Sequence, residues 1–70
     1  MMPLTLADRD EELIIKKVGG SPETKKHLED LGFTPGGMIT IVNTLSGNLI
    51  VNVKDSRVAI SEEMAKKIMV

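Results

Sequence analysis

The sequence predicts a mainly β protein with one inserted helix, folded as a small closed or half-closed barrel in a single domain over residues 1–70. Three observations carry this prediction: a well-capped helix over residues 21–31, a long strand-forming stretch over residues 38–54, and short strand-like segments near both ends. A strand, a helix and then a meander form an order that suits a barrel. Closing the sheet removes the exposed edges that a short open sheet presents for aggregation.

The predicted helix has a start signal, an apolar stripe and a stop signal. Ser21 is placed to accept a hydrogen bond from a free backbone N–H group, Pro22 takes a position that needs no donor, and Glu23 lies at the positive end of the helix dipole. The apolar or half-apolar residues recur at spacings of four and three, which puts them on one side of the helix: Thr24, Leu28 and Leu31. Gly32 ends the helix because glycine enters the left-handed conformation without a Cβ penalty, and Phe33 supplies the hydrophobic contact that often follows.

The rest of the chain reads as strands joined by tight connections. Strands are expected at residues 13–18, 38–44, 49–54, 57–60 and 68–70, with a hairpin loop at 45–48 and a helical turn capped by Ser61 at 62–67. Thr34–Gly37 is a turn, since proline fixes φ at its second position and glycine tolerates a positive φ at its third. Asp55 is expected in a left-handed turn position of the connection at 55–56.

Two stretches near the start of the chain fit a regular strand less well. Leu4 and Leu6 alternate with a polar residue and lead into a charged loop over residues 7–12. In the segment 13–18 the apolar residues do not alternate cleanly, so Ile15 and Val18 can both face the core only across a bulge. Later strands alternate well, and the following residues are expected to face the core: Ile39, Ile41, Leu49, Val51 and Val53.

Composition limits the classes of function. A net charge of −1 predicts no general affinity for nucleic acid or acidic membranes. The chain has no cysteine, hence no disulfide framework and no thiolate metal site, and no apolar run long enough to span a bilayer or serve as a signal peptide. We therefore expect a cytoplasmic protein without membrane insertion. The start at Met1 and the lack of linkers or repeats predict that it stands alone.

A set of residues spread over nearly the whole chain has a spacing typical of one protein family. The set begins with Leu28–Gly36 around the helix end and continues with Ile39, Ile41, Val51, Val53, Arg57, Ala59, Ile60, Ala65, Ile68 and Val70; Leu4, Leu6, Ile15, Val18 and Gly20 extend it. On these residues the sequence resembles the FeoA family, the small cytoplasmic proteins of bacterial ferrous-iron uptake, whose fold is an SH3-like β-barrel with an inserted helix. Two departures concern local turn geometry: the loop before Leu13 lacks the family's glycines, and Asp55 stands where glycine is common.

The resemblance implies a partner rather than a reaction. FeoA-like proteins act as adaptors or regulators of FeoB, a membrane ferrous-iron permease with a cytosolic GTPase domain, which implies recruitment to the inner face of the cell membrane. The composition also predicts a protein without enzymatic activity, with no catalytic residues and no cofactor. The chain has one histidine, no cysteine and no glycine-rich phosphate loop followed by lysine. The alternative is an interaction module related to the SH3-like C-terminal domain of metal-dependent transcriptional repressors. Such a module should follow a DNA-binding region, whereas this chain begins at its own methionine.

The helix and the turn after it are the predicted contact surface for the partner, because they combine a charged helical face with a rigid corner. The candidate partner-binding residues are Lys25, Lys26, Glu29, Asp30, Pro35 and Arg57. Arg57 has two interpretations: its guanidinium can present a planar fork to a partner carboxylate, or it can hold a group of its own barrel. We favour the second. The lysine pairs at 16–17, 25–26 and 66–67 are expected on the solvated surface. They have functional significance only where folding brings them together.

A ferrous-iron site on the helix is a weaker hypothesis. Glu23, His27 and Asp30 are spaced four and three apart on one helical flank, and imidazole with carboxylates suits ferrous iron. The simpler interpretation, which we favour, is that His27 is a boundary residue of an amphipathic helix and that Lys26 competes for Asp30 as an ion pair. Whether the protein self-associates is not encoded in any recognisable pattern.

Overall fold

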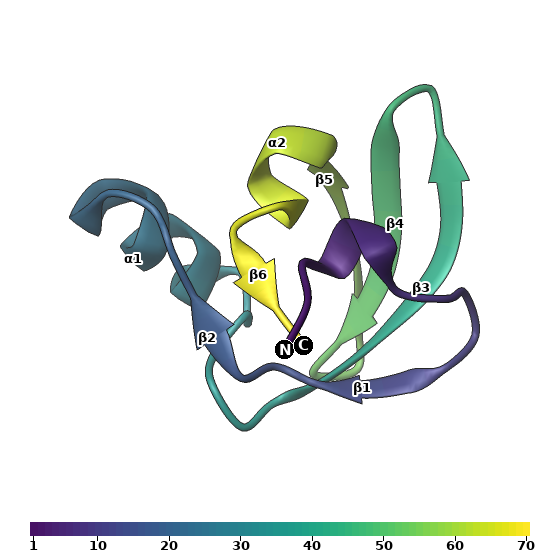
Figure 1. Ribbon diagram of the computed structural model, residues 1–70, viewed down its shortest axis with the longest axis horizontal. Helices are drawn as coiled ribbons and strands as arrows, with labels where there is room; N and C mark the ends of the chain where they lie inside the picture. Colours follow the sequence, from purple (N-terminus) through teal and green to yellow (C-terminus); the bar gives the residue numbers. More distant parts are fainter.

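Two antiparallel sheets enclose the core in the computed structural model, which describes residues 1–70. The larger sheet has the strand order β1-β3-β4-β5, from β1 (Glu12–Ile14), β3 (Met38–Leu45), β4 (Asn48–Val53) and β5 (Ser56–Ser61). The smaller sheet pairs β2 (Lys17–Val18) with β6 (Ile68–Met69). The helical elements are a 3₁₀ turn η1 (Leu4–Leu6), α1 (Pro22–Asp30) and α2 (Glu62–Ala65). This arrangement confirms the predicted half-closed barrel with one main helix (Figure 1).

Alternation along the long strands builds the core as predicted. β3 and β4 pair so that Ile39 lies opposite Val53 and Ile41 opposite Val51, and all four side chains are buried. Burying one face of each strand is what stabilises a sheet of this size. The core is wholly apolar, and its members are Leu4, Ile15, Val18, Leu28, Phe33, Ile39, Ile41, Leu49, Val51, Val53, Ile60, Ala65, Ile68 and Val70.

Both hairpins of the larger sheet have two-residue turns in the left-handed conformation. Ser46 and Gly47 have φ values of 50° and 81° between β3 and β4, and Lys54 and Asp55 have φ values of 48° and 63° between β4 and β5. Paired positive φ values give the turn twist that matches antiparallel strands. The left-handed Asp55 is confirmed, but the second connection uses residues 54–55 rather than the predicted 55–56.

The prediction of one strand over residues 13–18 is wrong, because the chain changes sheet there. β1 pairs with β3, whereas β2 pairs with β6. At the change, the N–H of Ile15 donates to the carbonyl of Gly37 (2.8 Å) and the N–H of Lys16 donates to that of Met69 (2.7 Å). Ile15 and Val18 are therefore both buried without a bulge between them. The one bulge that interrupts strand pairing lies between Ile41 and Asn43, where none was predicted.

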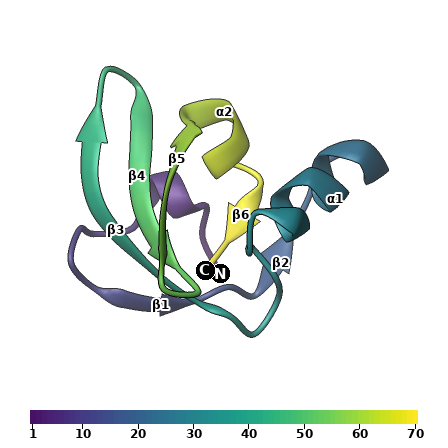
Figure 2. The same cartoon turned by 180° about the vertical axis from the view of Figure 1, so that it is seen from behind.

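The two ends of the chain meet on the barrel. The N–H of Met2 donates to the carbonyl of Val70 (2.9 Å), and the N–H of Val70 donates back to that of Met2 (2.8 Å). Both views place the N and C termini side by side, next to β6 (Figures 1 and 2). The turn η1 follows at once, burying Leu4 while Leu6 stays 69% exposed. Because the segment forms a 3₁₀ turn and not an extended strand, the two leucines point to different sides, one into the core and one to solvent.

Candidate functional site

Helix α1 stands at the side of the barrel, and local sequence signals set both of its ends (Figure 2). Oγ of Ser21 accepts a hydrogen bond from the N–H of Thr24 (3.3 Å), as the predicted N-cap should. At the other end, the N–H of Phe33 donates to the carbonyl of Leu28 (2.9 Å), and the N–H of Gly32 donates to that of Glu29 (3.0 Å). This pair of bonds is a Schellman motif, which requires the positive φ of 108° found at Gly32.

The buried and exposed sides of α1 follow the predicted stripe. Leu28 is fully buried, and Thr24 and Leu31 are half-buried. The charged residues of the predicted contact surface are all exposed: Lys25, Lys26, Glu29 and Asp30. The helix is thus anchored through one apolar stripe and presents both signs of charge to solvent.

The turn after the helix is held rigidly and adds an exposed corner. The N–H of Gly37 donates to the carbonyl of Thr34 (2.9 Å), and Gly36 has a φ of 88°, which closes the predicted turn. The N–H of Gly36 also donates to the carbonyl of Ile15 (2.7 Å), which ties the turn to the start of the barrel. Pro35 is exposed at this corner. We call Lys25, Lys26, Glu29, Asp30 and Pro35 the helix–turn surface.

Arg57, the sixth predicted partner residue, does not belong to the helix–turn surface. It lies on β5 opposite Asn52 of β4, and its Nε donates to the side-chain oxygen of that asparagine (3.4 Å). Both residues are exposed, and Asn52 alternates with the buried Val51 and Val53, so the contact is on the outer face of the larger sheet. The long side chain links two strands of its own barrel.

The structure does not assemble the hypothetical iron ligands into a centre. Glu23, His27 and Asp30 are exposed on α1. No group of three or more His, Cys, Asp or Glu side chains is placed to hold a metal ion. Ligands on one exposed helix also lack the outer hydrogen bonds that orient side chains in tight sites.

Replacing His27 tests the remaining metal hypothesis directly. We expect His27→Ala and the unaltered protein to give the same ferrous-iron titration under anaerobic conditions, because one exposed imidazole has no converging partners. Isothermal calorimetry is the measurement, and Lys25→Ala is the control for a change at the same helix surface. A loss of saturable binding in His27→Ala alone would establish the histidine as a ligand.

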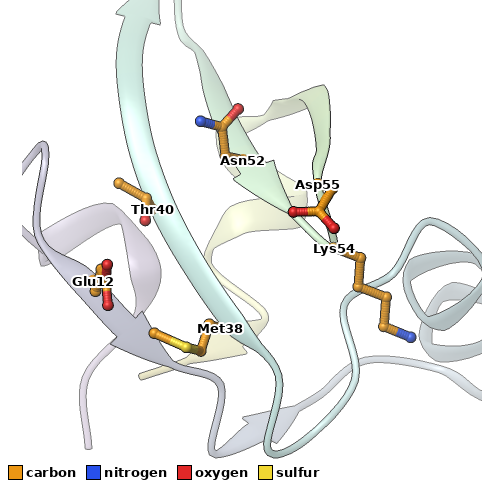
Figure 3. A pocket seen from close by; sticks show the side chains of 6 residues that line it. All are labelled: Glu12, Met38, Thr40, Asn52, Lys54 and Asp55. Carbon is orange, nitrogen blue, oxygen red and sulfur yellow. The ribbon is translucent and has the colours of Figure 1, made fainter.

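Two hollows on the surface were not predicted from the sequence. The larger, of about 480 Å³, lies on the outer face of the larger sheet and is lined by Glu12, Met38, Thr40, Asn52, Lys54 and Asp55 (Figure 3). Its two carboxylates come from opposite sides, with Glu12 on β1 and Asp55 in the β4–β5 turn. It contains no histidine and no paired acid and base of the kind that proton transfer needs.

The smaller hollow, of about 320 Å³, lies where β2 meets the turn between α2 and β6. Lys17, Lys66 and Lys67 line it together with two glycines and two methionines. The lysine pairs at 16–17 and 66–67 were the available sequence signal. Only the pairing of β2 with β6 shows that they meet.

The structure is a small β-barrel domain that presents a charged helix–turn surface to solvent. Comparison with known proteins identifies its family: the model of the FeoA domain matches residues 2–70. A Methanocaldococcus jannaschii protein, provisionally named Fe(2+) transport protein A, is 33% identical over 70 residues, which are 100% of this chain and 85% of that protein. The chain belongs to the FeoA family, a non-enzymatic family of accessory proteins of iron transport.

Solved structures agree with this assignment. The crystal structure of an iron uptake regulatory protein, FeoA, superposes with a TM-score of 0.89 at 28% identity and covers 99% of this chain and 92% of that one. The Stenotrophomonas maltophilia FeoA complexed with zinc, described as a procaryotic SH3 domain protein, gives a TM-score of 0.85 at 22% identity, with 100% and 89% coverage. The predicted SH3-like fold is thereby confirmed.

The alternative interpretation also has a structural counterpart. A manganese-dependent transcriptional repressor matches with a TM-score of 0.84 at 12% identity, covering 94% of this chain but 38% of that one. At this identity the likeness shows the shared fold alone.

Neither α1 nor α2 has the length and apolar composition of a bilayer-spanning helix.

Proposed function

We propose that this protein is a cytoplasmic adaptor that binds the cytosolic side of a FeoB-type membrane ferrous-iron permease and modulates iron uptake. The observation that carries the proposal is membership of the FeoA family over residues 2–70. The absence of a catalytic set from both hollows fits a protein that acts through contact. Recruitment to the inner face of the membrane then follows from the partner.

The helix–turn surface is the proposed contact. It is exposed, carries both signs of charge, and stands at the side of the barrel, where a partner reaches it without disturbing the core (Figures 1 and 2). The capped helix and the hydrogen-bonded turn hold this surface in one conformation before binding. A preformed surface loses less conformational entropy on association.

The first experiment is an amide NMR titration of the full chain with the cytosolic domain of the permease from the same organism, with GDP, with a GTP analogue and without nucleotide. We expect chemical shift changes at Lys25–Asp30 and around Pro35. A difference between nucleotide states would make the protein a regulator of the GTPase cycle. The absence of shift changes at saturating partner would contradict binding to that domain.

Charge reversal locates the interface. We expect Lys25→Glu and Asp30→Lys each to weaken binding about three- to tenfold, because complementary charges at an interface rim contribute modest energy and orientation. Both positions are exposed, so the amide spectrum should remain that of the folded barrel. Lys16→Glu is the matched control, since it reverses an exposed lysine outside this surface. Retained affinity in both helix variants would move the interface to another face.

A further inference from the structure

The smaller hollow gathers positive charge from two distant parts of the chain. Lys17 lies on β2, whereas Lys66 and Lys67 lie in the turn between α2 and β6. Backbone bonds hold these segments together: Lys17 pairs with Met69 across the small sheet, and the N–H of Gly19 donates to the carbonyl of Lys67 (2.7 Å). The three lysines are therefore brought together by the fold itself.

Gly20 leaves room for the side chain of Lys67. Gly20 has a φ of 100°, and a Cβ there would lie 3.1 Å from Cδ of Lys67 and 3.3 Å from Cγ2 of Thr24. The aliphatic stem of Lys67 thus lies against the bare backbone of Gly20, and Lys67 is half-buried whereas Lys66 is exposed. A stem packed in this way loses less freedom when its ammonium group binds a ligand.

No negative charge of the protein compensates these lysines within the hollow. No aspartate or glutamate lines it, although Glu63 lies on the adjacent α2 and Glu23 in the first turn of α1. None of the three ammonium groups takes part in a side-chain hydrogen bond. The whole chain has a net charge of −1, so the hollow is a positively charged region on a slightly negative protein. Positive charges held close together attract an anion.

We propose that the Lys17–Lys66–Lys67 hollow is an anion site for a phosphate group. A phosphate carries several acceptor oxygens that ammonium groups from two sides can reach together, which a single carboxylate matches less well. The volume of about 320 Å³ admits a phosphate with an attached group, such as a second phosphate or the glycerol of a lipid headgroup. None of the lining residues belongs to the helix–turn surface, so the site is separate from the proposed contact with the permease.

Pyrophosphate is the probe for the free-anion form of the ligand. In an amide NMR titration of the full chain at low salt, we expect saturable shift changes at Lys17, Gly19, Gly20, Lys66 and Lys67. The double variant Lys17→Gln/Lys66→Gln should bind about three- to tenfold more weakly per charge removed. Lys16→Gln is the matched control, because it removes a charge from the neighbouring residue, which does not line the hollow.

Vesicles distinguish the lipid source of the same chemistry. Sedimentation with phosphatidylglycerol vesicles, against phosphatidylcholine vesicles, should show binding that the double variant loses and Lys16→Gln keeps if the phosphate belongs to a headgroup. Local pyrophosphate shifts without vesicle binding would assign a free phosphate compound. The proposal is overturned if neither probe binds, or if both variants and the unaltered protein respond alike, which would indicate a general effect of ionic strength.

Discussion

Phe33→Ala is expected to lower the free energy of unfolding by about 3–5 kcal/mol, the cost of truncating a fully buried phenylalanine. Phe33 is the one aromatic residue of the chain and the largest fully buried side chain. It lies just beyond the C-terminal end of α1 and shares the core with Leu28 of that helix, so loss of its ring also weakens the attachment of the helix to the barrel. A core of this size supplies only about 3–5 kcal/mol in total, so the variant should be largely unfolded at 25 °C.

Urea denaturation followed by far-ultraviolet circular dichroism measures this loss, and amide NMR dispersion shows how much folded protein remains. Phe33→Leu is the matched variant, since it keeps most of the apolar volume and should lose about 1 kcal/mol. A dispersed spectrum for Phe33→Ala, with a midpoint close to that of the unaltered protein, would show that Phe33 does not hold the core together.

Gly32→Ala is expected to cost about 1–3 kcal/mol, the usual penalty for a non-glycine residue in a sparsely allowed conformation. The penalty comes from the φ of 108° at this position. A steric clash does not contribute, since the nearest atoms to an added Cβ, in Lys54 and Val53, would lie 3.6 Å away, which is an ordinary contact. The strain belongs to the backbone that carries the Schellman bonds. The variant should therefore fray the last turn of α1 before the barrel unfolds.

Hydrogen exchange at the amides of Gly32 and Phe33, together with urea midpoints, tests this expectation. Gly19→Ala is the control: its added Cβ would lie 3.5 Å from the carbonyl of Lys67, and its φ is not in the left-handed region. That variant should be as stable as the unaltered protein, or slightly more stable, because alanine restricts the unfolded chain. Equal stability of both variants would mean that Gly32 is not held in the left-handed conformation.

Local signals made most of the fold predictable. Hydrogen bonds of Ser21 and Gly32 within a few residues define the ends of α1, with Pro22 at a position that needs no donor. The alternation of Leu49, Val51 and Val53 indicates one buried face. The segment 13–18 departs from the prediction for the opposite reason. Its division into β1 and β2 depends on Gly37 and Met69, which are far away in sequence and are reached only in the folded chain.

The candidate sites also differ in whether local sequence or distant strand pairing forms them. Exposure of the helix–turn surface follows from an amphipathic pattern and a turn motif, so sequence alone located it. The hollow at Lys17, Lys66 and Lys67 arises from the pairing of β2 with β6, and no periodicity within either segment indicates it. For Arg57, the sequence predicts a role within its own barrel but not the partner. That partner, Asn52, depends on the register between β4 and β5.

The paired ends of the chain give this fold a circular character. Met2 and Val70 bond to each other through two backbone hydrogen bonds, so the break between first and last residue falls inside the structure's hydrogen-bonded network. If a longer polypeptide contained the barrel as an insertion, the two segments that connect to Met2 and Val70 would need to lie only a few ångströms apart. The adjacent ends therefore make the barrel compatible with insertion into a loop of a larger protein as well as with attachment at one end.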